Sequence, residues 1–139
     1  MLGAINHIAI CVANLKKSDE FWKPLMDFLG YERTLNSEAI SVWESKSTGS
    51  ATNFWQAKED HEYKYYAPGL HHIAFNAEQK SEVDDFFNLL QKVGAQVLDT
   101  PAKYDHYEPD YYAVYFKDIN GFKIELAYTP SAVVNGPKK

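Results

Sequence analysis

The sequence is poor in cysteine, in basic charge and in long apolar runs, and each shortage excludes a class of protein. Cys11 is the single cysteine among 139 residues, which excludes a disulfide-stapled scaffold. No apolar run approaches the roughly 20 residues that span a bilayer, and the first residues lack the pattern of a signal peptide. The net charge of −5 argues against a general nucleic-acid binder, because phosphate neutralisation needs a basic face. We therefore expect a cytoplasmic protein whose partners include neither nucleic acid nor a membrane.

Aromatic residues, by contrast, are abundant. Ten Tyr, eight Phe and three Trp make up 15% of the chain. A surplus of tyrosine is typical of pockets and interfaces, which are half apolar and half wet. The length corresponds to one domain, or to two small units that share a core.

The chain contains one internal repeat. Residues 6–10 (Asn-His-Ile-Ala-Ile) resemble residues 71–75 (His-His-Ile-Ala-Phe), and His72 follows His7 by 65 positions. The same offset pairs further residues: Asp19 with Asp84, Phe21 with Phe86 and Leu25 with Leu90. Because a unit of about 60 residues is marginal alone, we expect the two halves to share a core and to form a site between them.

Each half is predicted to be a βαβββ module, which gives an α+β fold. Module one covers residues 4–57, a polar linker covers 58–69, module two covers 70–128, and a loose tail covers 129–139. The expected strands of module one are 4–12, 31–36, 39–45 and 50–57, and those of module two are 70–77, 95–99, 111–117 and 121–128. An amphipathic helix follows the first strand of each module. Gly30 and Gly94 stand where helices favour a left-handed residue, and Asn120-Gly121 predicts a tight turn.

Two details of the helices are predicted from single residues. Pro24 lies inside the first apolar stripe, where it removes a backbone hydrogen bond, so we expect a kink or a late helix start. Ser81 is the expected N-cap of the second helix, with Asp84 in its first turn.

Strand alternation places three candidate ligands on corresponding faces. In residues 4–12, the isoleucines share one face, and His7 shares the other with Ala9 and Cys11. By the same rule, His72 and Glu125 lie opposite the apolar face of module two, whereas His71 faces the other way. Counting along the strands puts Gln56 near the place that Glu125 has in module two. Trp55 is the alternative, because a slip of one residue reverses the face.

Two imidazoles and one carboxylate on one surface form a ligand set for a divalent metal. Such a set suits Fe, Mn, Co, Ni or Zn and leaves positions open for a substrate. A strand histidine by itself is more often structural than a ligand, and His61 and His71 are interpreted in that way. The equivalent repeat positions of His7 and His72 favour the metal site.

Four stretches resemble the vicinal oxygen chelate superfamily, which includes glyoxalase I, fosfomycin-resistance proteins, extradiol dioxygenases, methylmalonyl-CoA epimerase and bleomycin-resistance proteins. They are residues 6–10, 18–30, 71–75 and 112–126, within a similarity that covers about residues 4–128. The last stretch, with Asp-Ile-Asn-Gly-Phe-Lys-Ile-Glu-Leu, is similar to the Asp-Pro-Asp-Gly-x-x-Ile-Glu-Leu ending of that family. The resemblance implies paired βαβββ modules curled into a bowl, with helices outside, a metal inside and often a homodimer.

The resemblance also implies roles for particular residues. His7, His72 and Glu125 match metal ligands, Gln56 stands at a position that is often glutamate, and Glu125 is the remaining candidate for a catalytic base. The implied activity is that of a metal-dependent lyase, isomerase or dioxygenase on a small oxygenated substrate. Two alternatives stay open: a metal-free small-molecule binding or resistance protein, and a dimer module whose bowl is vestigial.

A tyrosine-rich segment precedes the last hairpin. Five tyrosines fall between positions 104 and 115. We expect the segment to form a pocket wall in which Tyr104, Tyr107 and Tyr112 contact substrate, with Tyr112 as the hydroxyl that polarises or protonates it. His106 is a candidate proton shuttle and Lys103 a partner for an anionic group. Trp55 is a further candidate for the lining, and the alternative for the whole group is aromatic packing on the sheet.

Overall fold

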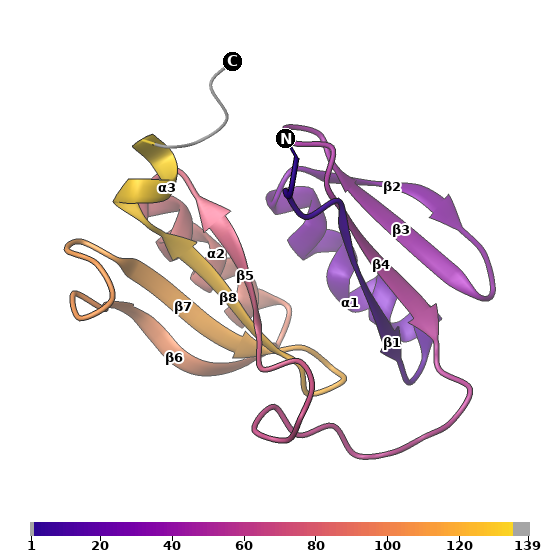
Figure 1. Ribbon diagram of the computed structural model, residues 1–139. Helices are drawn as coiled ribbons and strands as arrows, with labels where there is room; N and C mark the ends of the chain where they lie inside the picture. Colours follow the sequence, from indigo (N-terminus) through magenta and orange to yellow (C-terminus); the bar gives the residue numbers. More distant parts are fainter. Residues whose placement is uncertain (1, 135–139) are drawn as a thin grey trace. The chain divides into compact units, whose positions relative to one another are not determined.

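The computed structural model describes residues 2–134 and confirms the α+β fold of two βαβββ modules (Figure 1). The chain divides into two compact units, Met1–Glu62 and Tyr63–Lys139. The boundary falls inside the segment 58–69, which the sequence pattern predicts to be a linker.

Module one contains a four-stranded sheet and one helix. Its elements are β1 (His7–Val12), α1 (Leu15–Phe28), β2 (Tyr31–Asn36), β3 (Ile40–Ser45) and β4 (Ala51–Gln56). The strand order is β1-β4-β3-β2, with β1 and β4 parallel and the other pairs antiparallel. The helix packs through Trp22, which lies 5.6 Å from the ring of Phe54 on β4.

Module two repeats this arrangement and adds a short helix. Its elements are β5 (Ile73–Ala77), α2 (Lys80–Lys92), β6 (Gln96–Lys103), β7 (Tyr112–Lys117), β8 (Lys123–Tyr128) and α3 (Pro130–Val134). The strand order is β5-β8-β7-β6, with β5 and β8 parallel. Phe86 on α2 packs 5.7 Å from Phe116 on β7. Because the helix covers one face of its sheet, the opposite face is left for a site (Figure 1).

Of the two effects predicted for Pro24, a kink or a late helix start, the late start is wrong. α1 begins at Leu15, with Asn14 as its N-cap, whose side chain accepts a hydrogen bond from the Lys17 amide at 3.0 Å. Pro24 lies within the helix, where it typically costs about 3 kcal/mol. The buried Leu25 and Met26 follow it directly, so packing of the apolar stripe offsets that cost.

The predicted cap of the second helix is also wrong. Gln79, two residues before Ser81, is the N-cap of α2. Glu82 reaches back to accept the Gln79 amide at 3.1 Å, so the capping-box contact fixes the start. Asp84 consequently lies beyond the first turn. The predicted helix ends are confirmed, since Gly30 and Gly94 follow the C-caps with φ values of 76° and 72°.

Two segments are more ordered than predicted. β6 extends to Lys103 rather than ending at residue 99, and register shifts interrupt its pairing with β7 in the stretch that contains Pro101. The tail forms α3, where the Ser131 amide and hydroxyl donate to Glu108 at 2.7 and 2.8 Å. The rest of the predicted tail, 135–139, lies outside the described residues.

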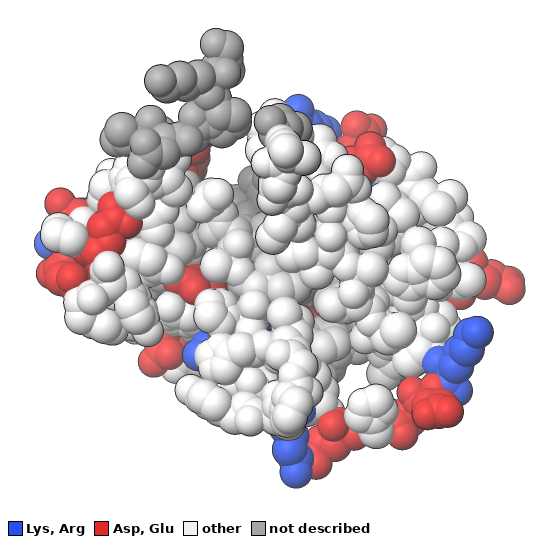
Figure 2. Space-filling view, viewed as in Figure 1, with Lys and Arg blue, Asp and Glu red and all other residues white. Residues whose placement is uncertain are grey.

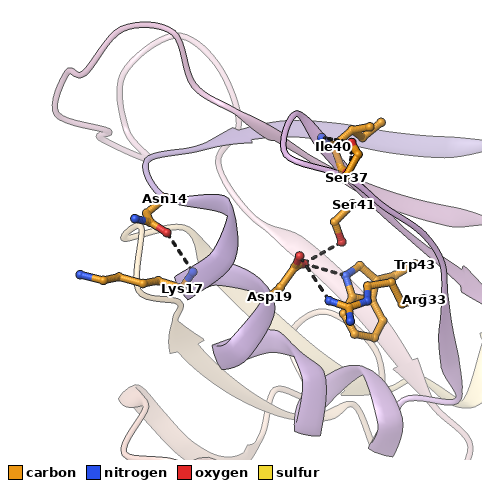
Figure 3. A network of polar contacts seen from close by, with 8 residues as sticks. All are labelled: Asn14, Lys17, Asp19, Arg33, Ser37, Ile40, Ser41 and Trp43. Atoms are coloured by element: carbon orange, nitrogen blue, oxygen red, sulfur yellow. Dashed lines mark hydrogen bonds and ion pairs between the residues drawn. The ribbon is translucent and has the colours of Figure 1, made fainter.

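A buried carboxylate ties α1 to its sheet (Figure 3). Asp19 is 6% exposed and accepts hydrogen bonds from Ser41 at 2.7 Å and from the Trp43 indole at 3.2 Å. Arg33 lies 3.5 Å from the other carboxylate oxygen, and its guanidinium stacks over Trp43. Three donors from β2 and β3 thus compensate the desolvation of Asp19.

Charged side chains are dispersed on the face that Figure 2 shows. Most of that face is uncharged, and its basic side chains form no continuous patch. Among residues 2–134, no helix is both long and apolar enough to cross a membrane.

Candidate functional site

Within module two, the structure brings His72 and Glu125 together. The parallel register sets Ala74 opposite Glu125, and His72 Nε2 lies 3.3 Å from Glu125 Oε2. Two ligands on one divalent ion, with bonds of about 2.1 Å, lie about 3.0–3.4 Å apart. The separation therefore fits two neighbouring positions of a metal coordination sphere. Glu125 is only 2% exposed, so its charge needs a cation or hydrogen-bond donors.

In both modules, the residue before the candidate ligand engages the histidine Nδ1. Asn6 Oδ1 lies 2.8 Å from His7 Nδ1, and His71 Nδ1 lies 2.7 Å from His72 Nδ1. Such a contact at Nδ1 leaves Nε2 of the ring as the atom that can bind a metal, which is how metal-binding histidines are usually held.

The prediction that His71 faces away from the site is wrong. β5 begins at Ile73, so the alternation of a strand does not extend back to His71 and His72. Their ring centroids lie 4.9 Å apart. Desolvation lowers the pKa of His71, and His72 and Lys123 lower it further. The two Nδ1 atoms share one hydrogen bond, in which either ring can be the donor.

Two tyrosine hydroxyls surround the buried carboxylate. Tyr111 donates a short hydrogen bond to Glu125 Oε1, and Tyr115 stands opposite Glu125 in the antiparallel ladder. Desolvation raises the pKa of both phenols, and the Glu125 charge raises it further. Both hydroxyls are therefore protonated at neutral pH and available as donors. Sequence reasoning included both in the tyrosine-rich segment but chose Tyr104, Tyr107 and Tyr112 as the substrate contacts. Tyr115 stands opposite Glu125 and so shares its face.

The tyrosine-rich segment lies against these residues. Tyr104 packs edge-on against Tyr115 with ring centroids 5.5 Å apart, and it stacks on Tyr107 at 6.1 Å. His106 lies 4.1 Å from the Tyr107 ring, and Tyr107 is 65% exposed. The segment thus continues the Glu125 face toward solvent, with Tyr104 innermost and His106 and Tyr107 outermost.

Two residues predicted to contact substrate point elsewhere. The Tyr112 hydroxyl donates to Asp84 on α2 at 2.6 Å, which places it on the face that the helix covers. That hydrogen bond raises the pKa of Tyr112 to about 12. Lys103 pairs with Tyr112 in the ladder, and its amine lies 3.6 Å from Asp110. The catalytic role assigned to Tyr112 and the anion-binding role of Lys103 are therefore not supported.

Gln56, predicted as a metal ligand, is a structural residue. It pairs with Val12, whose side chain is buried on the helix-covered face. Its Oε1 accepts the Leu15 amide at 2.9 Å, and its Nε2 donates to Ala13 at 2.9 Å, so both ends of the amide hold the start of α1. Counting along the sequence misplaced the register, and a slip of one residue reverses the face.

The residue equivalent to Glu125 is Asn53. Ala9 stands opposite Asn53 just as Ala74 stands opposite Glu125. Asn53 Oδ1 is a buried oxygen without a hydrogen-bond partner among residues 2–134. Trp55 pairs with Cys11 and is 44% exposed. It therefore lies on the sheet face that carries His7, which is the face required of a residue predicted to line the site.

A pocket of about 720 Å³ lies elsewhere in module one. Asn14, Asp19, Arg33 and Gln56 are among its lining residues, so it adjoins the start of α1. It opens beside the helix, whereas His7 lies on the opposite face of the sheet.

In the part of the chain that the structure describes, no group of three His, Cys, Asp or Glu side chains gathers in a metal-binding arrangement. Taken separately, module two offers His72 and Glu125, and module one offers His7. The donor types and the 3.3 Å separation within module two fit a divalent ion.

Paired βαβββ modules with imidazole and carboxylate groups on the uncovered sheet face define a protein of the glyoxalase fold. The family model of the Glyoxalase/Bleomycin resistance protein/Dioxygenase superfamily matches residues 4–126, and the chain belongs to this superfamily. The family is the vicinal oxygen chelate superfamily that the sequence motifs resemble, so that expectation is confirmed.

Individual proteins are similar over almost the whole chain. An uncharacterized protein of Bacillus subtilis, YqjT, is 31% identical over 88% of this chain and 96% of its own. The metallothiol transferase FosB of Staphylococcus haemolyticus is 30% identical over 91% of this chain and 84% of its own. A glyoxalase/bleomycin resistance protein from Albidiferax ferrireducens superposes with a TM-score of 0.74 over 91% of this chain and 98% of its own, and its 18% identity supports the fold alone.

Proposed function

We propose that the protein is a divalent-metal-dependent enzyme that binds a small organic substrate through two neighbouring oxygen atoms. His72 and Glu125 are the candidate ligands of module two, and His7 is the candidate ligand of module one. The separation of 3.3 Å between His72 Nε2 and Glu125 Oε2 carries the proposal. The contacts of Asn6 and His71 with the ligand histidines support it, because they leave Nε2 of each ring as the donor.

The reaction that the relatives favour is group transfer to an activated substrate. FosB is named a metallothiol transferase, which suggests addition of a thiol among the lyase, isomerase and dioxygenase reactions that the family resemblance implies. A bound divalent ion would act as a Lewis acid on the substrate oxygens. A cytoplasmic location and a homodimer stay predictions.

The chain's own residues have distinct parts in this proposal. Tyr111 donates a hydrogen bond to the Glu125 carboxylate, and the protonated hydroxyls of Tyr111 and Tyr115 are both donors on its face. The rings of Tyr104 and Tyr107 provide an apolar wall that excludes water and orients the substrate. Tyr111 and Tyr115 replace Tyr112 as the candidates for donating a proton.

Metal content of the purified full chain tests the proposal. Protein stripped with a chelator is incubated with Mn, Fe, Ni or Zn, desalted and analysed by mass spectrometry of the metals. We expect one divalent ion per chain in the wild type, loss of that ion in His72→Ala, and no change in His61→Ala, a histidine outside the candidate site. A wild type without stoichiometric metal, or equal losses in the two variants, contradicts the proposal.

One observation favours a second candidate, a metal-free small-molecule binding protein. Tyr111 and His72 already contact both oxygens of Glu125, so the buried carboxylate is compensated without a metal. Tight binding of an aromatic or oxygenated ligand by stripped wild type, unchanged in His72→Ala, would favour this candidate over the enzyme.

A further inference from the structure

Two lysines stand directly opposite each other on the sheet face that carries Glu125. Lys117 on β7 pairs with Lys123 on β8 in the antiparallel ladder. Alternation from Tyr115 to Lys117 and from Glu125 to Lys123 puts both amines on the side away from α2. Like charges at opposite positions destabilise a sheet, so this pair needs a reason other than folding.

Aromatic rings, rather than carboxylates, accompany these amines. Lys123 Nζ lies 4.9 Å from the centre of the Tyr115 ring and 5.5 Å from that of Tyr65, and Lys117 Nζ lies 5.4 Å from Tyr65. Among residues 2–134, no Asp or Glu oxygen lies within 4.0 Å of either amine. The rings orient the ammonium groups without neutralising them.

The nearest carboxylate in sequence is committed to another contact. Asp118 follows Lys117 directly, but it is 5% exposed, and its Oδ1 accepts the Asn120 and Phe122 amides at 2.9 and 3.0 Å. It stabilises the turn between β7 and β8. Both lysines are half-buried at the end of the site face.

The pair also adjoins the candidate metal ligands. Tyr65 packs against His71 at 5.7 Å, and His71 contacts His72. Tyr115, over which Lys123 lies, stands opposite Glu125. A substrate bound at His72 and Glu125 would therefore have these two amines on one side of it, across the rings of Tyr65 and Tyr115.

We propose that Lys117 and Lys123 form a subsite for an anionic oxygen group, a carboxylate or a phosphate, on the substrate of the enzyme. An anion between the two amines turns their mutual repulsion into two charge-assisted contacts. This inference rests on the proposed function for the substrate, while the anion site itself is a property of module two.

Anion titrations of the full chain test the subsite. Inorganic phosphate and acetate are added separately at constant ionic strength, and the imidazole C–H signals of His71 and His72 are followed by nuclear magnetic resonance. We expect saturable shifts in the wild type, and an apparent Kd about tenfold weaker in Lys123→Gln. The matched control is Lys92→Gln at the exposed end of α2, which should bind as the wild type does. Tighter binding of phosphate or of acetate identifies which anion the subsite prefers.

Thermal unfolding of the same proteins separates binding from a structural role. If the lysines serve as a subsite, Lys123→Gln keeps or raises the midpoint because it removes a like-charge pair. A wild type without saturable shifts overturns the subsite, and so does a lower midpoint with unchanged anion binding.

The metal content of the same proteins distinguishes failure of the anion subsite from failure of the proposed enzyme function. Lys123-dependent anion binding without metal uptake supports the subsite and contradicts the enzyme proposal. Stoichiometric metal in the wild type and both variants, with anion binding that ignores Lys123, overturns the subsite and leaves the enzyme proposal standing.

Discussion

The two modules share one topology but place their polar groups on opposite faces of the sheet. In module one, the buried carboxylate of Asp19 lies under the helix and binds Arg33 and two further donors. In module two, the buried carboxylate of Glu125 lies on the uncovered face beside His72. A charge under a helix stabilises packing, whereas a charge on the open face is available to a metal or substrate.

The equivalent positions show the same contrast. Asp84, the repeat partner of Asp19, is exposed and accepts a hydrogen bond from the Tyr112 hydroxyl. Asn53, the ladder equivalent of Glu125, is neutral. The two modules thus keep one backbone arrangement, while the buried acidic residue lies on the helix side in module one and on the site side in module two.

The largest effect is expected when the hydrogen-bond network of Asp19 in module one is broken. Asp19→Ala should lower the free energy of unfolding by about 3 kcal/mol, because it leaves Arg33 and the Trp43 indole without their acceptor. Asp84→Ala, its counterpart, should cost less than about 1 kcal/mol. Urea unfolding of both variants measures the difference, and similar costs would show that the two aspartates are not specialised.

The next prediction concerns Glu125 and Asn53. Glu125→Gln should weaken metal binding more than about 100-fold, because it removes a charged ligand. Asn53→Leu should keep or raise the free energy of unfolding by up to about 1 kcal/mol, since it removes a buried oxygen without a partner among residues 2–134. Competition with a chelator measures the first effect and urea unfolding the second. Full metal affinity in Glu125→Gln would remove this residue from the ligand set.

A smaller effect is expected from the residues that hold the histidine rings. Asn6→Ala and His71→Phe should each weaken metal binding about tenfold, because each frees the Nδ1 side of a ligand. Competition with a chelator measures both affinities. Equal effects would confirm that the modules hold their histidines in the same way. An effect confined to His71→Phe would assign the metal to module two alone.

The smallest expected effect comes from Tyr112. In the folded protein the pKa of Tyr112 is about 12, above the ordinary value of 10. The contact with Asp84 therefore stabilises the fold fully below pH 10, and this stabilisation is lost as the pH rises through about 12. Tyr112→Phe should cost about 0.5 kcal/mol at pH 7 and leave metal binding unchanged. An absorbance titration of the phenolates should show one group fewer with a pKa of about 12 in the variant than in the wild type. A loss of metal binding in this variant would restore Tyr112 to the site.

The candidate ligands could be proposed from the sequence because their positions follow from local rules. The repeat located His7 and His72, and alternation along β8 put Glu125 on their face. The same reasoning failed where neighbouring strands set the answer. Gln56 and Asn53 differ by three positions in one strand, and only the pairing with β1 shows which of them corresponds to Glu125.

For the aromatic and basic residues, too, the sequence identified some features and the structure decided others. The segment that contains Tyr104 and Tyr107 was identified by its composition. The choice between Tyr112 and Tyr111 depended on the face that each side chain takes, which their hydrogen bonds to Asp84 and Glu125 show. The face of Lys123 follows from the pairing of β7 with β8.

The sequence by itself determined the duplicated βαβββ topology, the helix ends and the three candidate ligands, because the periods of strands and helices and the conformation of glycine are local properties. Tertiary structure decided the strand register, the partners of each carboxylate and the lysine pair that faces the site. These depend on contacts between residues far apart in the chain, where a shift of one position reverses every side chain.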